Sequence, residues 1–371
     1  MNVPKLRFKE FSNDWKDEKL EDVVDFLDDR RKPIKDSDRN NIKGIYPYYG
    51  ASGIIDYIND YIFDEELLLL GEDGANILSR STQLVFKATG KYWVNNHAHV
   101  LRPKENYNID FLESCLENIN YEPYNTGTAQ PKLNQEVCRK INIKTPSLKE
   151  QVKIGKTLSL LDKKIELQTN KIEVLKLFKS YTKSEIFKNG NHVCKLGAIL
   201  NKWNKKNKDG TINYVESISN KAGFIPQSEQ FEDRNVASKN LRNYYVIKKG
   251  VFGYNPSRLN VGSLALKEND SISVVSPLYE CFTTTQNNTY LFEWFNSDYF
   301  KKETSSRFEG GVRNTLNFNN LCDIPINLPD IETQNKYAKY FNKLNFKISL
   351  EEQKLSKLLK YKKALLQDMF I

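Results

Sequence analysis

One stretch of this 371-residue sequence occurs twice, at a constant spacing of 183 residues. The first copy runs from Gly127 to Phe187 and the second from Gly310 to Phe370, without a gap between matched positions. Leucine matches leucine at 133 and 316, proline matches proline at 146 and 329, and glutamine matches glutamine at 151 and 334. Chance does not keep a register over this length. The chain therefore has two equivalent segments, and an internal duplication constrains the architecture more than any other feature.

Each copy reads as a short strand, a proline and a long helix. "INIKT" and "IPINL" alternate in polarity, and Pro146 or Pro329 ends the strand. Ser147 and Asp330 follow as candidate N-caps. Gly155 near the start of the first copy is the one helix-breaking residue in either helix. About 40 residues at about 1.5 Å each predict a rod of roughly 60 Å.

Both predicted helices carry a heptad seam of apolar residues. Gln168 and Glu351 occupy the same seam position, where a single polar residue tends to fix the register of a coiled coil. Two equivalent helices in one chain pair most simply about a pseudo-two-fold axis, and hence antiparallel. A coiled coil that serves only as a dimer handle is an alternative. The predicted seam residues are Leu158, Leu161, Ile165, Ile172 and Leu175 in the first helix, and Phe341, Leu344, Ile348, Leu355 and Leu358 in the second.

The regions between the repeated helices diverge after similar starts, "KLEDVV" and "KLGAIL". Both contain short predicted strands separated by turn residues, which is typical of a mixed α/β domain. The sequence therefore predicts an α+β fold with pseudo-two-fold symmetry. Two mixed α/β domains, at residues 1–145 and 191–328, are joined by two long antiparallel helices, at 146–190 and 329–371, that form a coiled coil.

Charge points to an anionic partner such as nucleic acid, because the net charge is +9 and the pI about 9.0. Residues 146–187 and 329–370 carry +4 each, which leaves +1 for the rest of the chain. The five cysteines are scattered, so neither a disulfide framework nor a zinc site is expected. No apolar run is long enough for a membrane span and the start has no signal core, which predicts a cytoplasmic protein.

These features resemble the specificity subunit of type I restriction–modification enzymes. The resemblance rests on the duplicated strand–proline–helix block with "TPSLKEQ" and "LPDIETQ", and on the Gly-x5-Leu-Asn element before each block. It also rests on "PYYGASGIIDYI", "LLLGEDGA" and "NNHAHVLRP" in the first half, and on "GSLAL" and "SPLYECF" in the second. It implies two target-recognition domains, each reading one half of a bipartite, non-palindromic site in double-stranded DNA. The helices would set the spacing and dock two modification subunits.

The resemblance further implies that this chain has no catalytic site and no cofactor of its own. S-adenosylmethionine would bind to the modification subunit, a methyltransferase. ATP and Mg would bind to the restriction (motor-nuclease) subunits, which join through the complex. The assembled complex would methylate adenine and restrict DNA. Consistent with this, the sequence has no Walker A loop, and Asn255-Pro256-Ser257 lacks the second proline and the aromatic residue of an amino-methyltransferase loop.

Loop residues with amide, hydroxyl, phenol or cationic groups are the expected DNA contacts. Gln130 and Arg313 occupy matched positions in the repeat, and Gln usually reads adenine while Arg reads guanine. The predicted contacts are Tyr49, Ser52, Arg80, Asn95, Asn96, Thr126, Gln130 and Lys132 in the first half, and Tyr254, Asn255, Arg258, Asn260, Arg307, Arg313 and Asn314 in the second.

Other candidate sites have simpler structural interpretations. His97 and His99 are expected on one side of a strand, without a metal ion, since no cysteine or carboxylate cluster adjoins them in the sequence. Gly71 and Gly74 in "GEDGA" read as a turn, because Glu72 and Asp73 oppose a phosphate. Two other functions stay open, a coiled-coil interaction protein with lectin-like or RNA-binding domains and a stand-alone enzyme.

Overall fold

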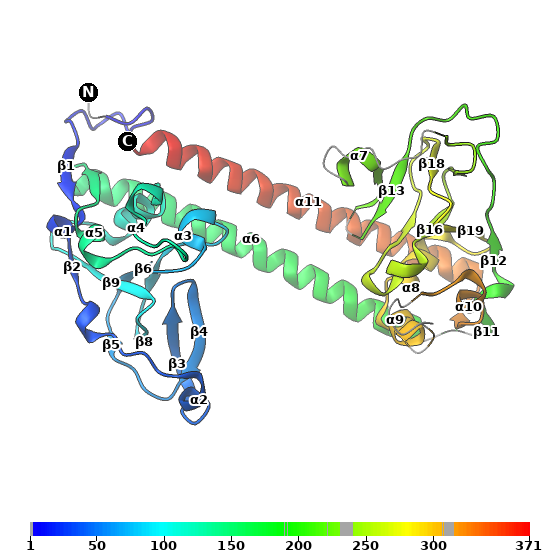
Figure 1. Ribbon diagram of the computed structural model, residues 1–371, viewed down its shortest axis with the longest axis horizontal. Helices are drawn as coiled ribbons and strands as arrows, with labels where there is room; N and C mark the ends of the chain where they lie inside the picture. Colours follow the sequence, from blue (N-terminus) through cyan, green and yellow to red (C-terminus); the bar gives the residue numbers. More distant parts are fainter. Residues whose placement is uncertain are drawn as a thin grey trace. The chain divides into compact units, whose positions relative to one another are not determined.

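The computed structural model describes residues 3–188, 190, 192–220, 222–230, 240–305, 307 and 315–371. The chain forms two compact units (Figure 1). The first unit comprises Met1–Thr169 and Gln353–Ile371, and the second comprises Asn170–Glu352. Helices α6 (Leu148–Lys188) and α11 (Ile331–Met369) each begin in one unit and end in the other. Two domains are therefore joined by two long helices, as the sequence predicts.

The first unit contains two four-stranded sheets. One has the order β2-β9-β6-β7 and is antiparallel throughout, with strands β2 (Val24–Phe26), β9 (Ala98–Pro103), β6 (Leu67–Gly71) and β7 (Val85–Ala88). The other has the order β4-β3-β8-β5, with β3 (Lys43–Gly50), β4 (Gly53–Ile58), β5 (Phe63–Asp64) and β8 (Lys91–Val94). Strand β6 is buried along its whole length, as its run of four leucines favours.

The second unit repeats the first of these sheets. Its order is β12-β19-β16-β17, again antiparallel throughout, with β12 (Leu200–Lys202), β19 (Glu280–Thr284), β16 (Phe252–Tyr254) and β17 (Leu264–Leu266). Two further strand pairs are β13 (Glu216–Ser219) with β14 (Gly223–Pro226), and β15 (Tyr245–Ile247) with β18 (Ser273–Val275). The two regions thus share a sheet topology although their sequences diverge.

The strands predicted before each proline pair with the strand that opens the divergent region of the same unit. Strand β10 (Asn142–Thr145) pairs with β1 (Lys16–Lys19), and β20 (Pro325–Leu328) pairs with β11 (His192–Lys195). The next residue is also held alike in both units. The backbone N–H of Leu20 donates to the carbonyl of Ile141, and that of Leu196 donates to the carbonyl of Ile324.

A buried glutamine fastens the start of each long helix to its own unit. The Gln151 side-chain amide donates to the Pro146 carbonyl at 2.9 Å and accepts from the backbone N–H of Asn108 at 3.0 Å. Asn108 is the N-cap of α4 (Ile109–Glu117). Gln334 makes the same contacts in the second unit, with Pro329 at 2.9 Å and with the N–H of Asn287, the N-cap of α8 (Asn288–Phe295), at 3.2 Å. The matched glutamines of the repeat therefore hold the start of the long helix to its own unit through the same two kinds of hydrogen bond.

The helix segments pair antiparallel within each unit. In the second unit Lys171 pairs with Glu351, and the ring of Phe187 lies 6.0 Å from that of Phe341, so residue numbers rise along α6 as they fall along α11. All ten predicted seam residues are buried or half-buried. Gly155 lies where a Cβ atom would meet Asn108 Oδ1 at 2.5 Å, so glycine lets α4 approach the helix closely. Among the described residues, no helix is both long and apolar enough to cross a membrane.

Candidate nucleic-acid interface

Four loops of the first unit meet beside one end of the β2-β9-β6-β7 sheet, and we call residues 51–53, 72–75, 95–97 and 126–132 the first loop cluster. Backbone hydrogen bonds join them: the N–H of Glu72 donates to the His97 carbonyl, and that of Gly74 donates to the Pro131 carbonyl. A Cβ on Gly71 would lie 2.6 Å from the Ala51 carbonyl oxygen, so the turn at 51–53 packs directly on this strand end. The cluster brings together segments far apart in sequence.

The Gly-x5-Leu-Asn element of the first copy, within "TGTAQPKLN" at residues 126–134, forms a closed loop in this cluster. The Asn125 side-chain oxygen accepts from the N–H groups of Gly127 and Lys132, and the N–H of Thr126 donates to the Lys132 carbonyl. A Cβ on Gly127 would lie 1.8 Å from the Gln130 carbonyl oxygen, so the loop closes only with glycine there. The Gln130 side chain is left exposed at the tip.

Half of the predicted contacts of the first unit are exposed, and one of these four, Lys132, pairs through Nζ with Glu72 Oε1 at 3.3 Å. Ser52, Asn96, Gln130 and Lys132 are exposed on the first loop cluster. Thr126 is exposed as well, but its hydroxyl donates to the Lys132 carbonyl. Short polar side chains on a rigid platform can reach base edges and phosphates.

The other three predicted residues make contacts within the protein instead. The expectation that Tyr49 lies in a loop is wrong, because it belongs to β3 and its half-buried ring stacks on Phe86. Asn95 is buried, and its side chain accepts from the N–H of His97. Arg80 ends a short helix with φ 48° and forms an ion pair with Glu117 at 2.8 Å.

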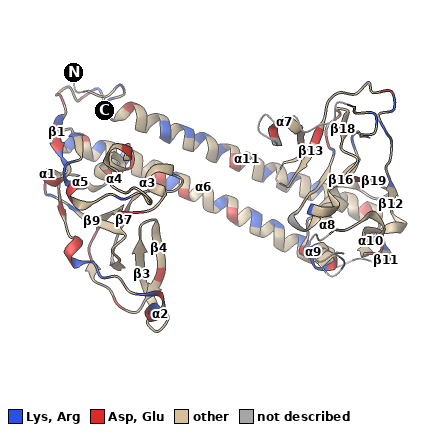
Figure 2. Ribbon diagram, viewed as in Figure 1, with Lys and Arg blue, Asp and Glu red and all other residues tan. Residues whose placement is uncertain are grey.

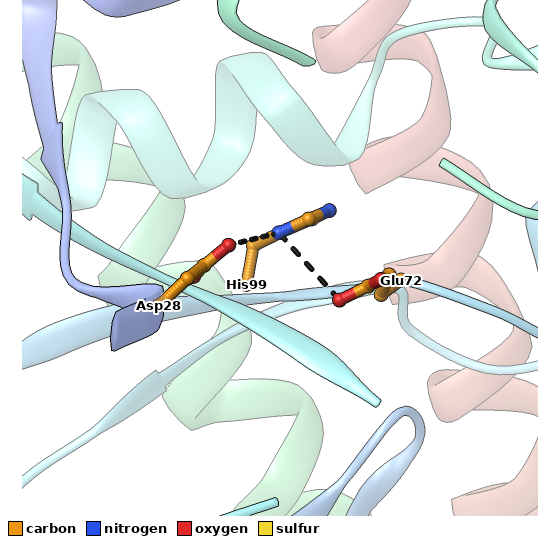
Figure 3. A group of neighbouring side chains, drawn as sticks. All are labelled: Asp28, Glu72 and His99. Atoms are coloured by element: carbon orange, nitrogen blue, oxygen red, sulfur yellow. Dashed lines mark hydrogen bonds and ion pairs between the residues drawn. The ribbon is translucent and has the colours of Figure 1, made fainter. Parts of the chain in front are cut away.

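Beneath the loop cluster lies a group of three ionisable side chains. Asp28, Glu72 and His99 point toward one another (Figure 3), with ligand atoms within 4.8 Å of one another. His99 Nδ1 lies 2.6 Å from Asp28 Oδ2, and Nε2 lies 2.8 Å from the Leu133 carbonyl oxygen. Both partners accept, so both ring nitrogens of His99 donate and the ring is an imidazolium. His99 belongs to β9, whereas His97 lies in the turn before it rather than on the same strand.

This arrangement is unsuited to a metal ion. Burial alone lowers the pKa of His99, but the hydrogen bond to Asp28 and that involving Cys138 raise it to about 10, so no ring nitrogen has a lone pair to offer at neutral pH. Arg31 lies 2.7 Å from Glu72 and 3.3 Å from Asp28, and compensates both carboxylates. Burial raises the pKa of Asp28, yet the hydrogen bond from His99 holds it below its ordinary value.

The network instead anchors the repeated loop to the sheet. Leu133 is held on both sides, since its N–H donates to the Glu72 carbonyl and its own carbonyl accepts from His99. The Gln135 amide donates to Asp28 at 3.0 Å. In the "GEDGA" turn, the backbone N–H groups of Glu72 and Gly74 already donate to backbone carbonyls. They therefore cannot bind a phosphate. The sequence gives no signal for this network, because its members lie in separate segments.

The second unit places a comparable loop at the corresponding strand end. After β16 the chain forms the 3-10 helix η4 (Pro256–Val261), and the Pro256 carbonyl accepts from the N–H of Leu316. Leu316 matches Leu133 in the repeat, and both are fully buried. Asn134 and Asn317 then begin the short helices α5 (Gln135–Arg139) and α10 (Phe318–Cys322). Equivalent strand ends therefore meet the same repeated element in both units.

The predicted contacts of the second unit divide in the same way. Arg258 is exposed on η4, and Asn260 belongs to the same helix. The expectation of a loop position for Tyr254 is wrong, because it is fully buried in β16. Asn255 caps η4 by accepting from the N–H of Ser257, and Arg307 pairs with Glu303 at 3.4 Å. Arg313 and Asn314, like Gly310 of the repeat, lie outside the described residues.

Comparisons with known proteins agree with this architecture. The family model for the type I restriction modification DNA specificity domain matches residues 12–177. A Haemophilus influenzae protein named as a type I restriction enzyme specificity subunit is 38% identical over 148 residues, which cover 40% of this chain and only 37% of that protein. The specificity subunit of the type I restriction enzyme MjaVIII from Methanocaldococcus jannaschii is 22% identical, over 95% of this chain and 91% of its own length.

A solved structure supports the fold along the whole chain. The S subunit of a type I restriction–modification system from M. genitalium superposes with a TM-score of 0.69 at 15% identity, and covers 100% of this chain and 99% of that one. At this identity the likeness concerns the fold, while the sequence matches concern the family. Taken with the duplicated helices and the two matched sheets, these relationships show that residues 12–177 match the type I restriction modification DNA specificity domain and that the whole chain is similar to specificity subunits of type I restriction–modification systems.

Proposed function

We propose that this chain is the DNA-recognition subunit of a type I restriction–modification complex, in which each unit reads one half of a bipartite, non-palindromic site. The observation that carries the proposal is the repeated sheet. The orders β2-β9-β6-β7 and β12-β19-β16-β17 are equivalent, but the loops at their equivalent ends differ in sequence and structure. A common framework with unlike loops suits two different half-sites, and so a site without a palindrome.

The exposed groups of the first loop cluster and of η4 are suited to contacts with bases and phosphates. Ser52, Asn96 and Gln130 offer hydroxyl and amide groups in the first unit, and Lys132 offers a cation. Arg258 is exposed in the second unit and has no side-chain hydrogen bond or ion pair within the described part of the chain. Amide side chains pair with adenine edges and Arg pairs with guanine edges in the major groove. The proposal therefore assigns base reading to these exposed groups rather than to the half-buried Tyr49 or the buried Tyr254.

The long helices would set the separation of the half-sites and dock two modification subunits. Leu167 and Leu350 are equivalent in the repeat and exposed, and the same holds for Phe178 and Tyr361. Exposed apolar side chains at matched positions support two equivalent protein contacts. Figure 2 shows lysines along both helices, which favours an acidic partner surface or nearby DNA.

The catalytic chemistry would belong to the partners. S-adenosylmethionine would bind to the modification subunits, which would methylate adenine, and ATP and Mg would serve the restriction subunits that join through the complex. This chain would contribute specificity alone. The names of the relatives support this division, since they are specificity subunits of restriction enzymes.

Replacement of Arg258 by alanine tests the assignment. Loss of a base contact should cost about 1–3 kcal/mol and relax one position of the second half-site only. Methylation of a randomised duplex library, by this chain with its modification subunit, gives the preference at every position. Arg242→Ala is the matched control, because Arg242 is exposed in the same unit but away from η4. Equal loss on every sequence would assign Arg258 to phosphate, and unchanged methylation would remove it from the interface.

A further inference from the structure

The second unit contains a basic cavity that sequence reading does not explain. The cavity has a volume of about 770 Å³ and lies between the C-terminal end of α6, helix α9 (Asp298–Ser305) and Asn327 of β20. Cavities of roughly 300–1,000 Å³ accommodate small ligands. Six lysines line this one: Lys176, Lys179, Lys183, Lys188, Lys301 and Lys302.

Carboxylates compensate only part of this charge. Lys179 and Lys183 share the buried Glu293, at 2.8 and 3.4 Å. Lys302 has no ion pair within the described residues. Burial lowers the pKa of Lys183, and the neighbouring charges of Lys179 and Lys301 lower it further against the effect of Glu293. The other three lysines pair singly, Lys176 with Glu352, Lys188 with Glu185 and Lys301 with Asp298, so six lysines face four carboxylates and two positive charges remain.

The repeat shows that the scaffold does not require these lysines. Four of the six lysines lie on α6, and at the spacing of 183 residues three of these match aliphatic residues: Lys176 matches Leu359, Lys183 matches Leu366, and Lys188 matches Ile371, which follows the end of α11. If the lysines of α6 only solvated its surface, their replacement by aliphatic residues would not be expected to gather at the C-terminal end of the helix. Because the matched positions of the second copy are aliphatic, this lysine lining is specific to the second unit.

The contact that the C-cap residue of the neighbouring helix makes with the long helix also differs between the two units. In the first unit Asn118, the C-cap of α4, donates from its side chain to the Leu366 carbonyl of α11. In the second unit Asn296, the C-cap of α8, accepts through its carbonyl from Lys183 Nζ at 2.8 Å. A direct helix contact in one unit is thus replaced by a lysine side chain beside a cavity in the other.

We propose that this cavity binds a phosphate-bearing ligand. An ammonium group acts as a compact point charge and suits phosphate oxygens arriving from several directions. No arginine lines the cavity, whereas planar, bidentate recognition of carboxylates favours Arg. The phosphate has two sources, a free oligophosphate such as a nucleoside triphosphate or the backbone of DNA. The site does not depend on base reading, because its residues are separate from both loop sites.

Calorimetric titration of the full-length chain with tripolyphosphate tests the proposal. Saturable binding at one site is expected, and Lys301→Gln/Lys302→Gln should weaken it at least tenfold. Lys176→Leu/Lys183→Leu, which installs the residues of the sister helix, should do the same. The matched control is Lys163→Gln/Lys164→Gln, two exposed lysines on the same helix outside the cavity, which should bind as the unchanged chain does.

Competition separates the two sources. Displacement of tripolyphosphate by a short duplex assigns the site to DNA phosphates, and binding unaffected by the duplex assigns it to a free oligophosphate. The proposal is overturned by absence of saturable binding, by wild-type affinity in Lys301→Gln/Lys302→Gln, or by citrate binding as tightly as tripolyphosphate. Failure of the proposed function would appear separately, as methylation without a sequence preference.

Discussion

Replacement of His99 by glutamine should remove a pH-dependent clamp under the first loop cluster. The imidazolium donates to Asp28 and to the Leu133 carbonyl. Glutamine is uncharged, and its side chain can replace only one of these two hydrogen bonds. The pKa of His99 rises from 6.5 to about 10, at about 1.36 kcal/mol for each unit. The clamp is therefore worth about 3–5 kcal/mol, which is also the range for removing one partner of a buried ion pair.

The sign of the pH dependence follows from the raised pKa. Stabilisation by His99 is complete below the unfolded-state pKa of 6.5 and is lost as pH rises toward about 10. Urea unfolding followed by fluorescence, together with hydrogen exchange at the Leu133 amide, should therefore show a large loss between pH 7 and pH 10.5 in the wild type. His99→Gln should be less stable at pH 7 and lose less on the same change.

The difference between the two proteins isolates His99 from the lysines and tyrosines that titrate in the same range. Trp15 is buried in the first unit and reports its unfolding. The reasoning is refuted if both proteins lose equal stability between pH 7 and pH 10.5, or if exchange at Leu133 does not change. Equal losses would mean that His99 is neutral in the folded chain, and unchanged exchange would mean that His99 does not hold the Leu133 segment in place.

Three further changes probe the scaffold. Lys267→Met should lower the stability of the second unit by about 3–5 kcal/mol, because it leaves the buried carboxylate of Glu216 unpaired, and Lys267→Met/Glu216→Gln should recover part of the loss in thermal unfolding. Gln334→Ala should cost about 1–3 kcal/mol by orphaning buried backbone groups, with Gln151→Ala as its counterpart in the first unit. Insertion of one helical turn after Leu161 should change the half-site separation in the methylated motif but leave each half-site unchanged; an unchanged separation would contradict the spacing role.

Local patterns in the sequence were sufficient to predict the scaffold. The strands, prolines and helices of the repeat depend on neighbouring residues and on a seam period, and the structure has them at the matched positions. The equivalence of Gln151 and Gln334 was visible as a match, although its partners Asn108 and Asn287 were not. The sheet orders could not be predicted, because pairing between distant strands leaves no local signal in regions whose sequences diverge.

The misplaced tyrosines have physical explanations. A register shift between Tyr48 and Tyr49 in β3 breaks the alternation of inward and outward side chains, so Tyr48 is buried and the neighbouring Tyr49 is half-buried. Strand β16 is covered on both faces, since Gly253 faces Phe224 while Tyr254 lies in the core on the other side. Aromatic residues beside glycine and asparagine resemble a binding loop in sequence, but burial of the whole strand makes them structural.

We propose that this chain selects the DNA sequence that its complex modifies. The most direct measurement is genome-wide adenine methylation in cells that carry this chain and its modification subunit, compared with cells in which this chain alone is deleted. We expect a split motif, with two unlike half-sites and an unspecified gap, that disappears on deletion. Methylation that persists unchanged without this chain would show that another component selects the sequence.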